Sequence, residues 1–429
     1  MEQLYVGVGQ EIMTPPLGMM LMGYTPPRPA LAVHDDLHVT AFALGYGDVK
    51  ALVISADMCN LRYRQEELHA VVAEATGIPS DNIIFACTHT HSGPHANWKL
   101  DQRPNYIDDQ LIPLTAKAAA AAVKSMRPAQ MGVGTTYSDV AVNRREITED
   151  GKVALGQNPY GSWDPTMTVV AFREPDGTPI GNLIHYGCHN TASGINDEVT
   201  RDWCGVAIDR LQEQSGGVTA FINGCGGDCG PRLANGKTTG NVQLAQELGG
   251  KAAIDAVRAW RSIKVWENAP LKVLKGDIHM PLQDVGTEQD VLAEAAALGD
   301  PSTLKSTMLT SYNRLMDRAE YLRQGNIPPK YETLPHTFIA LGGLVLQAIP
   351  FEVFSIITLR IKEGSPFEHT LCVGYANGSL SYFPSMDQVI RGGYEVRMFK
   401  TINLIPYADD AEQDYVAGSL KLIRELYTK

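Results

Sequence analysis

The sequence predicts an α/β fold in which mixed β-sheets are flanked by helices, as a layered α/β sandwich in a single large domain with a helical insertion. Short apolar runs, typical of buried strands, alternate along the chain with segments of helical spacing. The 429 residues, 44% of them hydrophobic and 20% charged, suffice to bury a substantial core. No internal repeat and no low-complexity linker is visible, so one domain over 1–429 is expected.

The N-terminal half favours strands at 4–8, 40–44, 51–55 and 82–87, and helices at 64–75 and 107–126. The run Ala-Leu-Val-Ile-Ser at 51–55 has the composition of a buried strand. The helix at 107–126 is rich in alanine and stops near Pro128, which cannot continue it. Residues 166–172 and 181–186 are expected to form a hairpin around Glu174-Pro-Asp-Gly, a strong turn signal.

In the C-terminal half, helices are expected at 203–214 and 242–263, with a strand at 218–222 between them. The stretch 287–325 is polar and helical in pattern, at 289–298 and 303–322, and has little strand signal. We interpret it as a helical insertion. Strands resume over 337–349, and a helix over 352–361 follows.

The charge and the termini narrow the classes of function. The net charge is −12 and the Lys and Arg residues are scattered, which argues against a nucleic-acid partner. The N-terminal residues lack the basic and apolar regions of a secretory signal, and no apolar run approaches the ~18–20 residues of a transmembrane helix. With seven widely spaced cysteines, a cytoplasmic protein is expected, and a homo-oligomer is compatible with the sequence.

The most informative segment is a buried strand that runs directly into two histidines, His89 and His91. Period-two geometry is expected to place both imidazoles on the same face, roughly 6–7 Å apart along the strand. The carboxyl end of a strand is also where α/β sheets usually carry their sites. An isolated His-X-His is as often a pair of loop residues, but a third histidine, His95, favours a metal site.

A second strand, at 181–186, ends just before His189. His185 falls inside this strand, where a hydrogen-bonded core histidine is the better interpretation, so it is the second choice as a ligand. His189 lies just past the strand end and is the preferred candidate. Two histidines from different strand ends and a carboxylate would supply most of a catalytic zinc site, with one position left for water.

A glycine-dense loop follows the strand at 218–222, and its candidate residues are Gly224, Cys225, Gly227 and Asp228. Such a loop lets backbone N–H groups approach a substrate or oxyanion closely. Cys225 can also be considered as a thiol nucleophile, although a small buried residue is the preferred interpretation.

Two further candidates would not be recognised in isolation: Glu352 would pass for an acid in a first helical turn, and Tyr382 for a packing residue. Together, however, these segments resemble the neutral ceramidase family, of the neutral/alkaline non-lysosomal type. The most specific match is Thr-His-Thr-His-Ser-Gly-Pro at 88–94. The supporting matches include Met22-Gly-Tyr24, Ser55-Ala-Asp57, Asn143-Arg144, Cys188-His189, Gly227-Asp228-Cys-Gly-Pro231, Pro350-Phe-Glu352, Tyr382-Phe-Pro384 and Gly392-Gly-Tyr-Glu395.

The resemblance implies a Zn²⁺ ion held by His89, His189, Glu352 and Tyr382. It further implies that His91 and Arg144 orient and stabilise the reacting carbonyl, with protonation of the leaving amine as an alternative role for His91. Asp57 and Asp202 are expected as hydrogen-bond partners of the imidazoles, although each fits a helix-cap role equally well.

The function implied by the resemblance is hydrolysis of an N-acyl amide bond by zinc-activated water, on a small-molecule or lipid-like N-acyl substrate. The alternatives are a zinc esterase or lactonase, a non-catalytic metal- or ligand-binding homologue, and a thiol hydrolase that uses Cys225. The family's C-terminal immunoglobulin-like domain is expected to be absent, because the chain ends about thirty residues after the last motif. A substrate smaller and more polar than ceramide is therefore expected.

Overall fold

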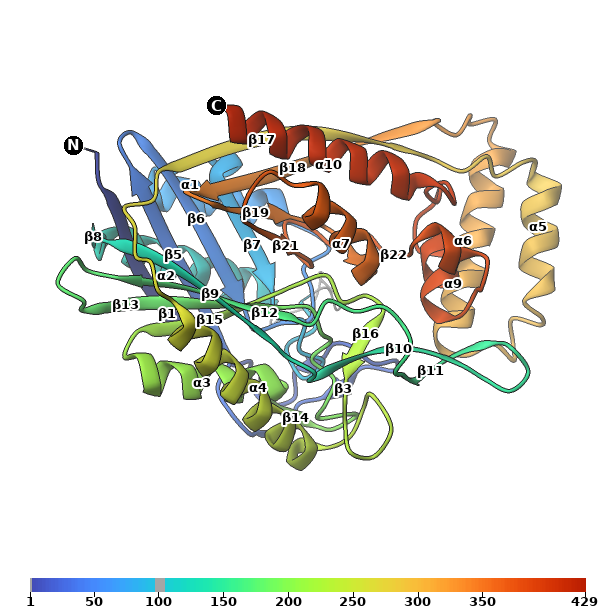
Figure 1. Cartoon of the computed structure of the whole chain (residues 1–429). Coiled ribbons are helices and arrows are strands. Elements are labelled where there is room, and N and C mark those ends of the chain that lie inside the picture. The colour runs from blue at the N-terminus through green and yellow to red at the C-terminus, as the bar shows by residue number, and fades with distance from the viewer. Residues whose placement is uncertain (1, 97–104) are drawn as a thin grey trace.

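The computed structural model describes residues 2–96 and 105–429, which form an α/β fold with mixed sheets flanked by helices, as the sequence predicts (Figure 1). Its three main sheets share one topology. Each is built in the order strand, strand, strand, helix, strand, helix, and the last two strands of each are parallel. The same order of strands and helices therefore occurs three times along the chain, as a repeat of topology.

The three units are defined by their elements. The first unit contains β1 (Leu4–Ile12), β5 (His38–Tyr46), β6 (Val49–Ala56), α1 (Gln65–Thr76), β7 (Ile83–Cys87) and α2 (Ile112–Lys124), and β8 (Arg127–Pro128) extends its sheet. The second unit contains β9 (Gln130–Tyr137), β12 (Thr166–Arg173), β13 (Pro179–Tyr186), α3 (Asp202–Ser215), β15 (Val218–Asn223) and α4 (Val242–Ser262). The third unit contains β17 (Leu271–Pro281), β18 (Tyr331–Leu341), β19 (Leu344–Ala348), α7 (Ser355–Gly364), β21 (His369–Val373) and α10 (Ala411–Thr428).

The three sheets share a central core, and each is covered on its outer face by the two helices of its own unit. Val53 of β6, Leu183 of β13 and Leu346 of β19 meet in the central core. The outer cores lie between the first sheet and α1 and α2, between the second and α3 and α4, and between the third and α7 and α10. Figure 1 shows α3 and α4 beneath the second sheet and α10 along the third. Both faces of these strands are buried, which explains their continuous apolar runs.

Each unit also carries an excursion between its first and second strands. In the first unit it forms the short strands β2 (Met20–Leu21), β3 (Arg28–Pro29) and β4 (Ala32–Val33), and in the second the strands β10 (Ala141–Ile147) and β11 (Val153–Asn158). In the third it forms α5 (Glu288–Ala297) and α6 (Ser306–Arg323), which pack on one another around a small core of their own. This pair lies at the far right of Figure 1 and coincides with the predicted helical stretch at 287–325.

The remaining elements lie near the carboxyl ends of the parallel strands. They are β14 (Glu198–Val199), β16 (Cys229–Pro231), β20 (Glu352–Val353), β22 (Tyr382–Phe383), α8 (Met386–Val389) and α9 (Tyr394–Thr401), apart from two short helical segments, Ser80–Asn82 before β7 and Ile107–Leu111 before α2. Within the described residues, no helix combines the length and the apolar character needed to cross a bilayer.

The predicted hairpin at 166–172 and 181–186 is confirmed by the antiparallel pairing of β12 with β13. The helix predicted at 352–361 instead begins at Ser355, and Glu352 lies in β20, which pairs with β22. The pairing of Glu352 with Tyr382 and of Val353 with Phe383 keeps this segment extended, so the helix begins three residues later than the apolar spacing suggests.

Candidate metal centre

The carboxyl ends of the three parallel strand pairs converge on one buried place. His89 follows β7, His189 follows β13, and Glu352 follows β19. Isolated bridges connect the three units here, pairing Thr90 with Asn190, Gly224 with Val373 and Ala86 with Ala376. The threefold topology therefore brings together side chains that are far apart in the sequence, as strand ends do in other α/β folds.

His89 and His91 converge, as the His-X-His pattern predicts, but not through the pleat of a strand. β7 ends at Cys87, and His89 has a left-handed backbone with φ 67°, fixed by its N–H donating to Met58 O at 2.9 Å. The Nε2 atoms of the two histidines lie 3.3 Å apart. A left-handed histidine is strained, and such strain is found mainly at functional sites.

Backbone carbonyls fix the orientation of both candidate ligand histidines. His89 Nδ1 lies 2.8 Å from Cys59 O, and His189 Nδ1 lies 2.9 Å from Gly226 O and 3.0 Å from Cys229 O. A carbonyl only accepts, so each Nδ1 carries the proton and each Nε2 presents a lone pair. Burial lowers the pKa of His89 to about 3 and lowers that of His189 well below its usual value, so both imidazoles are neutral.

Both lone pairs face the carboxylate of Glu352. Its Oε2 lies 3.5 Å from His89 Nε2 and 3.2 Å from His189 Nε2, and this atom is buried without a hydrogen-bond partner among the described residues. Two lone pairs and a carboxylate, with no proton between them, repel one another unless a cation lies among them. The three side chains therefore fit a metal ion, and they also satisfy the ligand separation expected of a metal-binding group.

Tyr382 and Arg144 complete this cluster. The Tyr382 hydroxyl lies 3.5 Å from His189 Nε2 and accepts a hydrogen bond of 3.0 Å from Arg144 Nη2. Burial, followed by the Glu352 charge, raises the pKa of Tyr382 well above its usual value, although Arg144 opposes this. Burial by itself lowers the pKa of Arg144, but Tyr382 and Glu395 raise it well above its usual range, so the guanidinium is charged.

The glycine-dense loop at 224–228 has a different role from the predicted oxyanion site. The N–H groups of Gly224 and Gly227 donate to Tyr186 O and Val353 O, so neither is free to bind a substrate. The Asp228 carboxylate accepts from the Ser355 N–H at 2.8 Å. Cys225 is buried in the third core and burial raises the pKa of its thiol, which argues against a thiol nucleophile. The loop therefore supports the two segments that carry His189 and Glu352.

Asp57 and Asp202, the predicted carboxylate partners of the imidazoles, bind backbone N–H groups near the histidines instead of the imidazoles. Asp57 accepts from the His38 N–H at 2.8 Å, and Asp202 accepts from the N–H groups of Ala192 and Ser193 at 3.0 and 2.7 Å. Carbonyls occupy the imidazole Nδ1 atoms instead, because the strand ends bring backbone closer than any carboxylate. Asp202 thus fixes the loop that follows His189.

His185, the second choice as a ligand, points away from the cluster. Its Nε2 lies 3.0 Å from Cys372 O, inside the interface between the second and third sheets. Its position within β13 rather than after it accounts for the difference.

Three residues of the site have no functional role assigned to them from the sequence. Glu395 is fully buried and accepts from Arg144 Nε at 2.9 Å and from Arg145 Nη1 at 2.6 Å, which holds both cations in place. Tyr375 stacks on His89 with ring centroids 4.0 Å apart. Cys59 forms a second metal-compatible group with His89 and His91. Glu395 lies in a glycine-rich motif noted above, but only its distant partners reveal its role.

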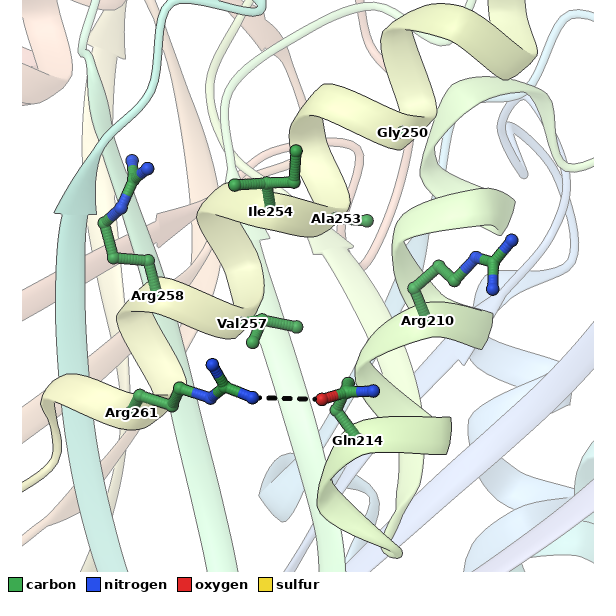
Figure 2. Close-up of a pocket in the computed structure, with 8 residues that line it drawn as sticks. All are labelled: Arg210, Gln214, Gly250, Ala253, Ile254, Val257, Arg258 and Arg261. Atoms are coloured by element: carbon green, nitrogen blue, oxygen red, sulfur yellow. Dashed lines mark hydrogen bonds between the residues drawn. The ribbon is translucent and has the colours of Figure 1, made fainter.

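The groove between α3 and α4 is separate from this cluster. It has a volume of about 570 Å³ and is lined by Ile254, Val257 and several arginines, with none of the candidate metal ligands (Figure 2). Figure 2 shows that Arg261 crosses it to bond Gln214, at 3.1 Å. No converging set of acids or histidines lines it, so it does not compete with the histidine cluster as a reaction site.

No protein-family model and no curated protein sequence matches the chain. Solved structures do match its fold. One is described as a ceramidase complexed with C2, with a TM-score of 0.75 and 17% identity. Another is the neutral ceramidase from Pseudomonas aeruginosa, with a TM-score of 0.72 and 18% identity. Each alignment covers 99% of this chain and 75% of the other. The chain therefore has the fold of the neutral ceramidases, as the sequence resemblance implies.

Proposed function

We propose that the protein is a zinc-dependent amidohydrolase that cleaves the amide bond of an N-acyl compound. The observation that carries the proposal is the set of two unprotonated imidazole nitrogens around the unpartnered carboxylate of Glu352. Two imidazoles, a carboxylate and a phenol form a donor set that suits zinc. The fold of the amide-cleaving neutral ceramidases supports the same reaction class.

His89, His189, Glu352 and Tyr382 would hold the ion. When bound, zinc supplies an activated water and polarises the carbonyl of the substrate. The protein's own contribution is to present the two histidine ligands without protons on the facing atoms, through the carbonyls of Cys59 and Gly226. Tyr382 keeps its proton, because burial and the Glu352 charge outweigh the hydrogen bond that Arg144 donates to the phenol oxygen.

His91 is placed to handle the proton of the leaving amine. Its Nε2 lies 3.3 Å from His89 Nε2, which carries no proton, so His91 Nε2 holds the proton of this contact. Burial keeps the pKa of His91 well below its usual value, so the ring is neutral and can protonate the leaving amine only after it has taken up the proton released by the attacking water. An amide, unlike an ester, needs its leaving group protonated, and this favours amide substrates over the ester alternative.

Arg144 supplies fixed positive charge next to the candidate ligands. Its guanidinium is buried and donates to Glu395 through Nε and to Tyr382 through Nη2. A fixed charge in a buried site stabilises negative charge that develops on the carbonyl oxygen of the substrate, without any reorganisation during the reaction.

The test combines metal analysis with hydrolysis of short N-acyl amines. Purified protein is expected to contain about one zinc per chain, and a chelator should abolish hydrolysis until zinc is restored. His189→Ala should lose both zinc and activity. His279→Ala, at an exposed histidine of β17 outside the cluster, is the matched control and should retain both. Full zinc content in His189→Ala would contradict the ligand assignment.

A further inference from the structure

The excursion of the first unit places a hairpin directly against His91. β2 and β3 pair with one another, and the turn between them is fixed by Met22 N–H donating to Gly93 O at 3.0 Å. Gly23, with φ 118°, lies so close that a Cβ there would be 2.3 Å from His91 Cγ. Only glycine permits this approach. The hairpin is therefore part of the wall beside His91.

This hairpin packs Tyr24 on His91 and Arg28 on Tyr24. The ring of Tyr24 meets the His91 ring edge to face, with centroids 5.0 Å apart, and Arg28 Cζ lies 5.0 Å from the centroid of Tyr24. Arg28 Nε donates to Asn196 O at 2.7 Å, and Arg28 Nη2 lies 3.3 Å from His91 O. These contacts fix the guanidinium in one orientation next to the candidate reaction site.

Three polar atoms of this group are left over. Tyr24 Oη, Arg28 Nη1 and His91 Nδ1 are buried and have no hydrogen-bond partner within the part of the chain that the structure describes. Among the described residues, Arg28 forms an ion pair with Asp197, 3.8 Å away, and half of the Asp197 side chain is exposed. Tyr24 Oη and Arg28 Nη1 are donors, whereas Nδ1 of the neutral His91 ring, with its proton on Nε2, is an acceptor. Buried donors without a partner are costly, and a largely buried cation with a weak partner is costlier still. Such a group is expected where a ligand supplies the missing acceptors.

We propose that Arg28 and Tyr24 bind an anionic group, a carboxylate, on the amine portion of the substrate, so that the substrate is an N-acyl amino acid. A carboxylate supplies the countercharge and accepts from both the guanidinium and the phenol. Tyr24 contacts His91, which in turn contacts the candidate ligand His89. The Arg28 and Tyr24 pair therefore lies next to the residue that is proposed to protonate the leaving amine. An N-acyl amino acid carries its carboxylate close to the amide nitrogen. This inference rests on the proposed amidase function.

The test measures binding to the chelator-treated protein, in which no turnover interferes. N-octanoylglycine and the neutral N-octanoylethanolamine share the acyl chain and differ in the charge of the amine portion. By isothermal titration calorimetry, the wild type is expected to bind N-octanoylglycine about tenfold more tightly or better, as one charge-assisted hydrogen bond allows. Arg28→Gln should remove this preference, with the ethanolamide affinity unchanged.

Two further variants sharpen the result. Arg62→Gln is the matched control, because Arg62 also stacks on a tyrosine, Tyr63, but lies outside the cluster around His91, and it should keep the preference. Tyr24→Phe keeps the ring on His91 and removes only the hydroxyl, so it should weaken N-octanoylglycine binding several-fold. It also serves if Arg28→Gln does not fold.

Equal affinity of the wild type for the two compounds, or a preference that survives in both Arg28→Gln and Tyr24→Phe, would overturn the inference. Activity of the zinc-loaded protein separates the two proposals. If binding shows the Arg28-dependent preference but neither compound is hydrolysed, the carboxylate site stands and the amidase function fails. If both are hydrolysed with equal kcat/KM and bind equally, the amidase function stands and the carboxylate site fails.

Discussion

At the scale of single residues, Glu352 links the stability of the metal-free protein to its ability to bind a metal. Its buried carboxylate faces the unprotonated Nε2 atoms of His89 and His189 at 3.5 and 3.2 Å. Glu352→Gln replaces one oxygen with an amide N–H₂ that can donate to these atoms. We expect this variant to be about 1–3 kcal/mol more stable than the wild type without metal, since it removes a buried carboxylate oxygen that has no hydrogen-bond partner among the described residues and that faces two lone pairs.

With zinc present, the wild type should instead be more stable than Glu352→Gln. Metal that binds only the folded state stabilises the wild type, whereas Glu352→Gln has lost a ligand and should respond weakly. Urea unfolding midpoints with chelator and with zinc provide the measurement. Glu368→Gln, at a glutamate whose side chain is 80% exposed, controls for the loss of one charge. A glutamine variant that is less stable under both conditions would show that the carboxylate has a partner in the metal-free protein.

Which of these residues can be recognised from the sequence depends on where they lie. His89 and His189 directly follow apolar strands, so the change from an apolar run to imidazole marks them. Arg28 and Glu395 lie on a two-residue strand and a short helix, and neither directly follows an apolar strand. Their roles follow only from partners more than sixty residues away, His91 for Arg28 and Arg144 for Glu395.

At the scale of elements, the loop at 224–228 and the strand β20 are in direct backbone contact. Gly227 N–H donates to Val353 O at 2.8 Å, and a Cβ at Gly227 would lie 2.3 Å from Glu352 O. Gly227→Ala must therefore push β20 away. We expect a loss of about 1–3 kcal/mol in the free energy of unfolding, and a weaker affinity for zinc because Glu352 moves with its strand.

The measurement is a zinc competition titration against a chromophoric chelator, together with urea unfolding. Gly250→Ala is the matched control. Gly250 lies in α4, where a Cβ would meet no atom within 4 Å, so the substitution should leave zinc binding unchanged and raise stability by up to about 1 kcal/mol. Wild-type zinc affinity in Gly227→Ala would mean that β20 does not position Glu352.

The boundary between strand and helix around Glu352 shows why element ends are hard to predict. Apolar spacing over 352–361 fits a helix, and Glu352 resembles an acid of its first turn. The structure keeps Glu352 extended because it pairs with Tyr382, a contact over thirty residues of sequence. Long-range pairing therefore decides the position of a ligand that local pattern assigns to a helix.

At the scale of the whole molecule, the strands and helices are predictable but the threefold repeat is not. Each unit needs only apolar strands and amphipathic helices in the same order, and many residue combinations meet that requirement. The first sheet contributes Val53 to the central core, the second contributes Leu183 and the third contributes Leu346. The repeat therefore lies in topology, and the excursions of the first and second units bring Arg28 and Arg144 to the site.

The same dense packing buries histidines that have no part in the site, and this makes stability depend on pH. His336 of β18 lies between Leu334 O and the hydroxyl of Tyr415, each 3.0 Å from a ring nitrogen. Burial lowers its pKa from 6.5 to about 4. The unfolded chain then takes up the proton first as the pH falls. The stability that neutral His336 contributes is complete above about pH 6.5 and declines as the pH falls towards 4.

His336→Gln isolates this contribution, because the other titrating groups are common to both proteins. A shift from 6.5 to about 4 corresponds to roughly 3 kcal/mol. The stability advantage of the wild type over the variant should be largest at pH 7.5 and smaller by that amount at pH 4. Urea unfolding at half-unit pH intervals measures it, and His279→Gln, at an exposed histidine in the neighbouring strand, controls for the replacement of a histidine by glutamine. A pH-independent difference for His336→Gln would mean that the folded protein accepts the proton on His336 as readily as the unfolded chain does.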